Sequence, residues 1–516
     1  MGMVESSLPV LSLLVLLPLI GAGIISCIPN RRAGAARWVA LLFSFLPLLL
    51  SVYLYTLVWS APPPEKAFGY LSADSLHFEE RFDWVPSLGV SYSMGVDGIS
   101  LPLVFLTALL SFLAIIFSWS ETRRPKAYFG LMLVMEVGVV GVFMAIDFFL
   151  FYIFWEIVLI PMYFLIGIWG GPRKDYAAIK FFIYTHVASV VMLLGIMGLY
   201  FQCRDALGYS TFSMIEIAKV SPTLSSGFQY VAFAALFFGF AAKMPSVPFH
   251  TWLPDAHVEA PTAGSVLLAG LLLKMGGYGL IRVAIPLLPV GAQAAVPVMV
   301  VLGVVSIVYG ALLCLAQNDL KKMVAYSSIS HMGFVMLGVA TLSPLGISAA
   351  VFQMFTHGLI TAVLFMMCGV FHHSAGTREI SRLGGLAQKI PMAAGVFLTG
   401  SLASLGLPGL CSFISEFLVF YSAFATFGAW MWIPVISIVL TAAYYLWAAQ
   451  RVLFGKFRVN LPKKEKGHLD DLHLHEAVAL GILIALIVFF GLFPSAVIAL
   501  TNPVSSAIAG IFAGVG

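Results

Sequence analysis

The chain has 516 residues, of which 61% are hydrophobic and only 10% are charged, and its mean hydropathy is +1.01. Soluble domains carry about a quarter charged residues, so this composition excludes a water-soluble globular protein. The net charge of +4 is spread thinly along the chain, which excludes a nucleic-acid-binding surface. We therefore expect an all-α, polytopic membrane protein in contact with the lipid bilayer.

Fourteen apolar runs are long enough for a membrane-spanning helix, which needs about 20 residues. The runs are continuous rather than alternating, which excludes a transmembrane β-barrel. The first run has no basic start and no cleavage site, so we interpret it as a retained span. In chain order the predicted spans cover residues 8–28, 36–58, 98–118, 127–146, 148–169, 177–201, 228–250, 261–286, 294–315, 319–342, 345–371, 391–420, 429–453 and 476–497.

The distribution of basic residues tests this count, because Lys and Arg collect in cytoplasmic loops. Most of the 27 basic residues fall in the odd-numbered loops of this scheme. The pattern predicts that both termini lie on the non-cytoplasmic side. The residues assigned to odd loops are Arg31, Arg32, Arg37, Arg123, Arg124, Lys126, Arg173, Lys174, Lys321, Lys322, Arg378, Arg382, Lys389, Arg451, Lys456, Arg458, Lys463, Lys464 and Lys466.

Two extramembrane segments stand out. Residues 60–95 mix prolines, acidic residues and aromatics, and they predict a small cap on the non-cytoplasmic side. Residues 456–475 form the only strongly polar run. We interpret this run as a solvated connector or docking face, in preference to a metal site built on its histidines.

Two predicted spans contain helix breakers. The seventh reads AAKMPSVPFHTWLP, and the twelfth reads SLASLGLPGLCSFISE. Proline removes a backbone donor and clashes with the preceding turn, so each span should be interrupted. Freed backbone groups are tolerated at membrane depth only beside protein or a water-filled cavity, which predicts a polar interior. The alternative is a packing kink without transport.

The two breaks lie five helices apart, which predicts two five-helix units. An odd number of crossings inverts the second unit relative to the first, and inverted repeats with broken helices are typical of ion-coupled transporters. We divide the chain into N-terminal helices and cap (1–126), a first repeat (127–287), a second repeat (288–455), and a connector with the last helix (456–516).

The sequence carries no pattern for binding a cofactor. It has no phosphate-binding glycine loop of the ATP or NAD type. Its five cysteines lie far apart without a C-x-x-C pair, so they predict neither a disulfide framework nor a zinc or iron–sulfur site. We expect no cofactor and no metal on this chain, and the energy for transport must come from a partner or an ion gradient.

Four charged residues lie deep inside predicted spans: Glu156, Lys243, Lys274 and Glu416. A charge at the bilayer centre costs about 2.5–3.5 kcal/mol, so each needs a partner or a function. Glu156 and Lys243 have opposite signs in one unit, and their pairing or separation would act as a proton switch. Lys274 and Glu416 show no partner in the sequence. The alternative for each residue is a structural ion pair.

Histidines extend this set. His331 and His357 fall within the tenth and eleventh spans, where imidazole can relay protons near neutral pH. A hydrogen-bonded structural role is the alternative. Weaker candidates are His186, His250, His257, Asp147 in a supporting role, and Lys180, which could tune Glu156.

Four stretches carry a family resemblance: FFLFYIFWEIVLIPMYFLIGIWGG, AAKMPSVPFHTWLPDAHVEAPTAGSVLLAGLLLKMGGYGLIR, DLKKMVAYSSISHMGF and SLASLGLPGLCSFISEFLVF. From about residue 90 to 455 the chain resembles the M-type (chain 4) antiporter-like subunit of proton-pumping NADH:quinone oxidoreductase, respiratory complex I. The resemblance implies fourteen helices with two inverted five-helix repeats. It also implies proton-channel roles for Glu156, Lys243, Lys274 and Glu416, and glutamate rather than lysine at position 416 is typical of the M-type subunit.

The resemblance further implies that NADH, FMN, iron–sulfur clusters and quinone bind partner subunits of the complex. Partners would be other membrane subunits, including sister antiporter-like subunits, in a bacterial cytoplasmic membrane. Protons would pass from the cytoplasm toward Lys243, then Lys274 with His331 and His357, and leave by Glu416. Three alternatives stay open: a Mrp-type Na⁺/H⁺ antiporter subunit, a structural scaffold, and the same role in a ferredoxin-linked or hydrogenase-linked relative.

Overall fold

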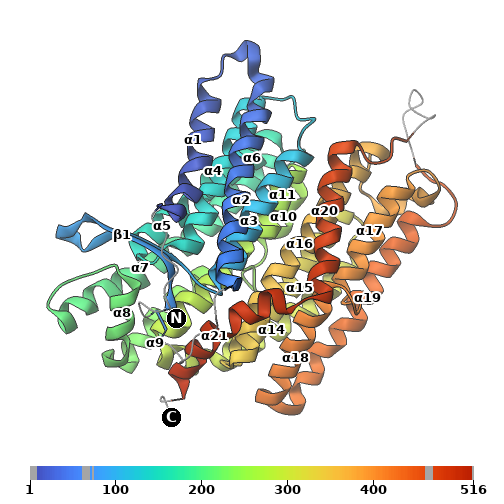
Figure 1. The fold of residues 1–516 in the computed structure, drawn as a ribbon. Coiled ribbons are helices and arrows are strands. Elements are labelled where there is room, and N and C mark those ends of the chain that lie inside the picture. Colours follow the sequence, from blue (N-terminus) through green and yellow to red (C-terminus); the bar gives the residue numbers. More distant parts are fainter. Residues whose placement is uncertain (1–7, 61–69, 72–74, 460–468, 514–516) are drawn as a thin grey trace.

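A computed structural model of the chain describes residues 8–60, 70–71, 75–459 and 469–513. Apart from one β-hairpin, the described residues form an all-α bundle (Figure 1). The first half comprises α1 (Val10–Cys27), α2 (Ala36–Ser60), β1 (His77–Val85), β2 (Val90–Val96), α3 (Ser100–Phe117), α4 (Pro125–Met144), α5 (Phe148–Ile157), α6 (Leu159–Trp169), α7 (Lys174–Leu207), α8 (Met214–Val220), α9 (Ser226–Lys243), α10 (Trp252–Glu259), α11 (Thr262–Leu267), α12 (Leu273–Gly279) and α13 (Ile285–Leu287).

In the second half, the described residues form helices joined by loops, with no named strand. It comprises α14 (Pro289–Leu315), α15 (Leu320–Ala340), α16 (Pro344–Ala375), α17 (Pro391–Ser404), α18 (Cys411–Phe427), α19 (Trp432–Leu453), α20 (Leu474–Leu492) and α21 (Ser495–Phe512).

The predicted all-α membrane fold is confirmed, and each of the fourteen predicted runs contains a helix. By length and hydropathy, thirteen helical segments among the described residues could cross a membrane. That set counts α18 and α19 as one segment, leaves out the broken-span helices α9 and α17, and adds α21. The sequence did not predict α21, because Thr501 and Ser505 interrupt its apolar run. Both residues are buried, and the hydroxyl of Thr501 pairs with that of Ser348 on α16.

Both predicted breaks are present. In the seventh span α9 ends at Lys243 and α10 begins at Trp252, whose indole N–H donates across the break to the carbonyl of Ala242 at 2.9 Å. In the twelfth span α17 and α18 are separated by a loop in which Gly406 and Gly409 have φ values of +80° and +92°. That left-handed backbone favours glycine, so the loop can turn inside the bundle without strain.

The eighth span contains an irregularity that the sequence did not predict. Two π-helical turns, Leu268–Leu272 and Leu280–Ala284, flank the short helix α12. Such turns shift the backbone hydrogen bonds by one residue and recur at functional sites. They place Lys274 of α12 within a segment whose side chains are buried throughout.

The loops expected on the cytoplasmic side do gather at one end of the bundle. Arg37 donates to the carbonyl of Trp119 at 2.9 Å, and the indole N–H of Trp169 donates to the carbonyl of Arg123 at 2.8 Å. Figure 1 shows the connection from α1 to α2 at this end and α8 with α21 at the opposite end. We call the end with the α1–α2 connection the basic end. It also carries the loops 118–124, 170–173, 316–319 and 376–390, the last three of which are connected through hydrogen bonds to Val258 and Glu259 and to one another.

The assignment of Lys321 and Lys322 to a loop is wrong, because both lie in the first turn of α15. Asp319 caps α15 by accepting the backbone N–H of Lys322 at 2.9 Å, so the helix already includes Lys321 in its first turn. This start turns the side chain of Lys321 into the bundle, where its ammonium donates to the carbonyl of Ala260 at 2.5 Å. Lys321 is 3% exposed, whereas Lys322 stays partly exposed.

The described part of the predicted cap is an antiparallel hairpin of β1 and β2, in which His77 lies opposite Val96. Asp147 joins it to the bundle, since its carboxylate accepts the backbone N–H of Ser91 at 3.0 Å and caps α5 through the N–H of Phe149. Burial raises the pKa of Asp147, although these hydrogen bonds to the carboxylate act in the opposite direction. These contacts give Asp147 a structural role, since it fixes the hairpin to the start of α5.

A buried ion pair connects the end of the hairpin to the eighth span. Arg282 and the carboxylate of Asp97 lie 2.5 Å apart, and both side chains are at most 2% exposed. The same carboxylate accepts the backbone N–H groups of Ile99 and Ser100 at the start of α3. Burial would raise the pKa of Asp97, but Arg282 and these hydrogen bonds outweigh it, so the pKa lies below its usual value.

We expect Asp97→Asn to destabilise the fold, because it leaves the guanidinium of Arg282 buried without a counter-charge. Removing one partner of a buried ion pair costs about 3–5 kcal/mol. A thermal unfolding scan of the chain in detergent should show a clearly lower midpoint. Asp83→Asn on the exposed face of β1 is the matched control. Equal midpoints for the two variants would contradict the structural role of the pair.

Candidate functional site

Lys274 and His357 form the centre of a row of buried polar side chains. The ammonium of Lys274 on α12 lies 2.6 Å from Nδ1 of His357 on α16. It also donates to the carbonyl of Ala269 in the neighbouring π-helical turn. Both side chains are buried. The sequence showed no partner for Lys274, because the partner lies 83 residues further along the chain.

The row continues from His357 to Glu416. The imidazole rings of His357 and His331 have their centroids 5.5 Å apart. Nδ1 of His331 lies 3.2 Å from a carboxylate oxygen of Glu416, and its Nε2 lies 3.1 Å from the hydroxyl of Ser404. The hydroxyl of Ser412 donates to the same carboxylate oxygen at 2.7 Å.

This row brings four predicted residues together from four helices. Lys274 comes from α12, His357 from α16, His331 from α15 and Glu416 from α18, close to the break in the twelfth span. The Lys274–His357 contact is a hydrogen bond, the His331–Glu416 contact is an ion pair, and the two imidazoles between them are ring neighbours. Amines, imidazoles and carboxylates can each accept and release a proton, so the arrangement can transfer protons.

Glu156 and Lys243 do not pair directly in this structure. One carboxylate oxygen of Glu156 lies 3.0 Å from Nδ1 of His186 on α7, and the other has no hydrogen-bond partner among the described residues. The ammonium of Lys243 is buried without a hydrogen bond there, and it lies 5.2 Å from the ring centroid of Trp155. A cation over an indole face is attracted by the ring, which compensates in part for the absent carboxylate.

Lys180 has a different partner from the one predicted. Its ammonium lies 2.7 Å from the carboxylate of Asp255 on α10, so it connects α7 to the second part of the broken seventh span. The weaker candidate His186 instead contacts Glu156, and its ring stacks on Phe182. Which helix lies beside α5 could not be inferred from spacing along the chain.

Two further buried groups lie between the row and the basic end. His257 on α10 is fully buried, neither ring nitrogen has a hydrogen-bond partner among the described residues, and the ring stacks on Phe365 at 4.4 Å. Phe365 lies eight residues beyond His357 on α16, or about 12 Å along a helix. Lys321 lies beyond His257, at the carbonyl of Ala260. The sequence placed His257 among weak candidates and missed Lys321.

Glu136 on α4 is a buried carboxyl group that the sequence reasoning missed. It is fully buried, and neither of its carboxylate oxygens has a hydrogen-bond partner within the described residues. The same signal that identified Glu156, a single acidic residue in a long apolar run, was available in GLMLVMEVGVVGVFM.

The interrupted helices and the buried row together define a membrane protein of the ion-translocating class. The chain belongs to the NADH:quinone oxidoreductase/Mrp antiporter transmembrane family, whose model matches residues 145–441. That match contains every residue of the row.

Comparisons with individual proteins agree with this family. The chain is 44% identical to the F(420)H(2) dehydrogenase subunit M of Methanosarcina mazei, over 99% of this chain and 100% of that one. It is 38% identical to the NADH-quinone oxidoreductase subunit M of Rickettsia conorii, over 95% of this chain and 97% of that one. It also matches a chain of respiratory complex I from Thermus thermophilus with a TM-score of 0.84 and 29% identity, covering 98% of this chain and 100% of that chain.

Proposed function

We propose that this chain is a proton-translocating membrane subunit of NADH:quinone oxidoreductase, driven by redox chemistry in partner subunits. The observation that carries the proposal is the row of Lys274, His357, His331 and Glu416. The Rickettsia relative is named as a subunit of that enzyme, which supports NADH as the electron donor and quinone as the acceptor. NADH, FMN, iron–sulfur clusters and quinone would then bind elsewhere in the complex.

A second electron donor has a specific observation in its favour. The relative from Methanosarcina mazei is a subunit of an F(420)H(2) dehydrogenase, and it aligns over nearly the whole chain. The proton route would be the same in either complex, because it uses residues of this chain alone. The family description also covers Mrp antiporters, which we place third because Glu416 resembles the M-type subunit. The subunits that copurify with the chain distinguish the three.

Protons would cross the chain in two parts. The first part would lead from the basic end, taken as cytoplasmic, to the middle of the bundle at Lys274. Lys243 lies at the break in the seventh span, and His257 with Lys321 offers a second set of titratable groups on this side. The second part would lead from Lys274 through the two imidazoles to Glu416 and the opposite side.

The electrical work fits the energies available to such a route. Moving one charge across a membrane potential of 100 mV takes about 2.3 kcal/mol. Separating a partly buried ion pair changes energies by a few kcal/mol, which is of the same size. Movement of Glu156 between His186 and Lys243 would raise or lower the proton affinity of the lysine and so serve as the switch.

Replacing Glu156 by glutamine tests this switch. The new amide can still contact His186 but has no charge for Lys243, so we expect proton pumping in proteoliposomes to fall about tenfold or more, the effect of at least about 1.4 kcal/mol. The complex should assemble normally, since the side chain is partly exposed. Glu79→Gln on the exposed side of β1 is the control. Undiminished pumping by Glu156→Gln would exclude the switch and leave the row of Lys274 to Glu416 to be tested separately.

The proposed location is a bacterial cytoplasmic membrane, with the basic end inside and both termini outside. The clustering of basic loops at one end of the bundle supports this orientation. The chain would contact other membrane subunits of the complex, including sister antiporter-like subunits. The division into two inverted repeats, 127–287 and 288–455, also stays a prediction, which the matched breaks at α9–α10 and α17–α18 support.

A further inference from the structure

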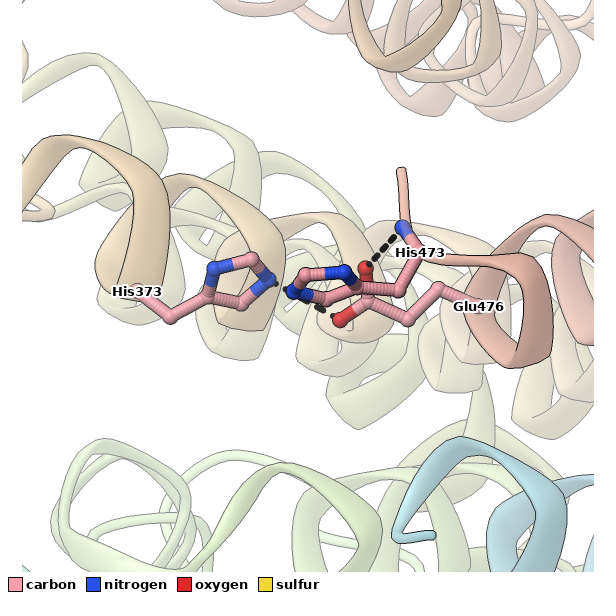
Figure 2. Close-up of side chains that lie close together, drawn as sticks. All are labelled: His373, His473 and Glu476. Atoms are coloured by element: carbon pink, nitrogen blue, oxygen red, sulfur yellow. Dashed lines mark hydrogen bonds and ion pairs between the residues drawn. The ribbon is translucent and has the colours of Figure 1, made fainter. Parts of the chain in front are cut away.

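Three side chains of types that can ligate a metal meet at the basic end, away from the row of Lys274, His357, His331 and Glu416. His373 lies near the end of α16, while His473 and Glu476 lie at the start of α20. Nε2 of His373 lies 2.9 Å from a carboxylate oxygen of Glu476. Figure 2 shows both imidazole rings and the carboxylate turned toward one another, with a ring nitrogen of His473 facing His373. One potential ligand atom from each residue lies within 4.8 Å of the others.

The donor set favours one class of ion. Two imidazole nitrogens and one carboxylate oxygen are the ligands of three-residue zinc sites, in which water takes the fourth position. Calcium and magnesium prefer oxygen ligands, so they fit poorly. Both histidines are exposed and Glu476 is buried, so an ion can enter from solvent and meet a fixed carboxylate at the base of the site.

The surrounding contacts hold the three side chains in place. The second carboxylate oxygen of Glu476 accepts the backbone N–H of His473 at 3.0 Å. Nδ1 of His373 lies 3.3 Å from the hydroxyl of Ser374, which also contacts the carbonyl of Asp470 at 3.1 Å. The ring of His473 lies between those of His373 and His475 in a stack. In metal sites, hydrogen bonds to the ligand atoms that do not coordinate the ion hold the ligand side chains in the right orientation.

We propose that His373, His473 and Glu476 bind a divalent transition-metal ion of the Zn²⁺ type, which joins the end of α16 to the start of α20. Zinc–ligand bonds of about 2.0–2.2 Å place tetrahedral ligand atoms roughly 3.4 Å apart. The ligand atoms of His373 and Glu476, now 2.9 Å apart, would separate slightly, and the wider separations in the cluster, which are within 4.8 Å, would shorten. His373 is exposed and can make this movement by rotating its side chain. Because α16 also carries His357, the ion fixes a helix of the proton row at its basic end.

Metal binding competes with two contacts of the metal-free arrangement. The proton of the hydrogen bond between His373 and Glu476 occupies the place that the ion would take, so this hydrogen bond breaks when the ion binds. The side chain of His473 also caps α20 by accepting the backbone N–H of Glu476. An imidazole that coordinates through one nitrogen carries its proton on the other, so this cap is lost when the ion binds.

Little in the sequence indicated this site. The polar run 456–475 contains His473 and His475, and we interpreted it as a connector rather than a metal site. The missing ligand, His373, comes from a predicted span end 100 residues earlier, and Glu476 is the first residue of the last predicted span. Residues 460–468 of the run lie outside the described part of the chain.

A zinc titration of the full chain tests the proposal. The chain, without a histidine tag, is stripped with a chelator in detergent and titrated with Zn²⁺ against a chromophoric chelator. We expect one tight Zn²⁺ site per chain. His373→Gln removes one ligand and should lower the Zn²⁺ affinity about tenfold or more. Co²⁺ should give the visible bands of a tetrahedral site in the parent chain and lose them in this variant.

His372→Gln is the matched control, because His372 is the exposed neighbour of His373 and lies outside the cluster. It should bind Zn²⁺ like the parent chain. Equal affinities for His372→Gln and His373→Gln, or no tight site in the parent chain, would overturn the proposal. Glu476→Gln should weaken binding as well, and a thermal scan of that variant separates loss of the ligand from loss of the α20 cap. Proton pumping is not a readout here, so failure of this proposal is independent of the proposed function.

Discussion

Replacing Lys274 by methionine should reduce proton translocation by the assembled complex about tenfold or more. Methionine is close to lysine in size and fits a buried apolar position, so the fold should be retained. The variant removes the amine bonded to His357, and the row then has no proton carrier on α12. Proton uptake into proteoliposomes, measured with a fluorescent pH dye after addition of the electron donor, gives the rate.

Lys274→Arg separates the charge of this residue from its ability to release a proton. Arginine keeps the positive charge, but it cannot be deprotonated in proteins. If Lys274 transfers protons, both variants should lose pumping. If it only supplies a charge, Lys274→Arg should pump well and Lys274→Met should not, which would contradict a proton-transfer role. Lys322→Met, at a partly exposed lysine, should leave the rate unchanged. Normal pumping by both Lys274 variants would favour the scaffold alternative.

The apolar runs made the spans predictable, and helix breakers made the two interruptions predictable. The prolines of the seventh span and the Gly-Leu-Pro-Gly segment of the twelfth remove backbone hydrogen bonds whatever surrounds them, so their effect is local and visible in the sequence. The π-helical turns beside Lys274 were not visible, because no residue type demands them. The helix α21 was missed for a related reason. The buried hydroxyl of Thr501 pairs with that of Ser348 on α16, whereas the sequence shows only that residue 501 is polar.

The sequence identified most residues of the candidate site, but it did not show which of them contact one another. A single charge in an apolar run is conspicuous, and Glu156, Lys243, Lys274 and Glu416 were identified this way. Glu136 carries the same signal, so its omission was avoidable. The partners of these residues depend on which helices pack together.

Lys321 was missed for a subtler reason: it was counted among the basic loop residues, although the predicted span 319–342 and the helix α15 both contain it. Lys321 and Lys322 look identical in the sequence as loop residues. The cap formed by Asp319 fixes the helix start, and the helical period then directs one lysine inward and the next outward.

Glu416→Gln should also reduce proton translocation about tenfold or more, because it removes the last proton acceptor of the row. Glutamine keeps the size of the side chain and can still accept the hydroxyl of Ser412. It cannot take a proton from His331, which lies 3.2 Å from the carboxylate. The loss should appear in the same proteoliposome assay, and the content of assembled complex should be normal.

Two comparison variants, one beside His331 and one at a surface ion pair, distinguish proton transfer from packing. Ser404→Ala removes the hydroxyl beside Nε2 of His331 and should cost only a few-fold, since it changes the orientation of the imidazole and not its ability to bind a proton. Glu379→Gln, at a partly exposed ion pair with Arg382, should have no effect, because surface pairs contribute about 0–1 kcal/mol. Full pumping by Glu416→Gln would show that protons leave without this carboxylate, and the exit would then have to lie elsewhere than at the break in the twelfth span.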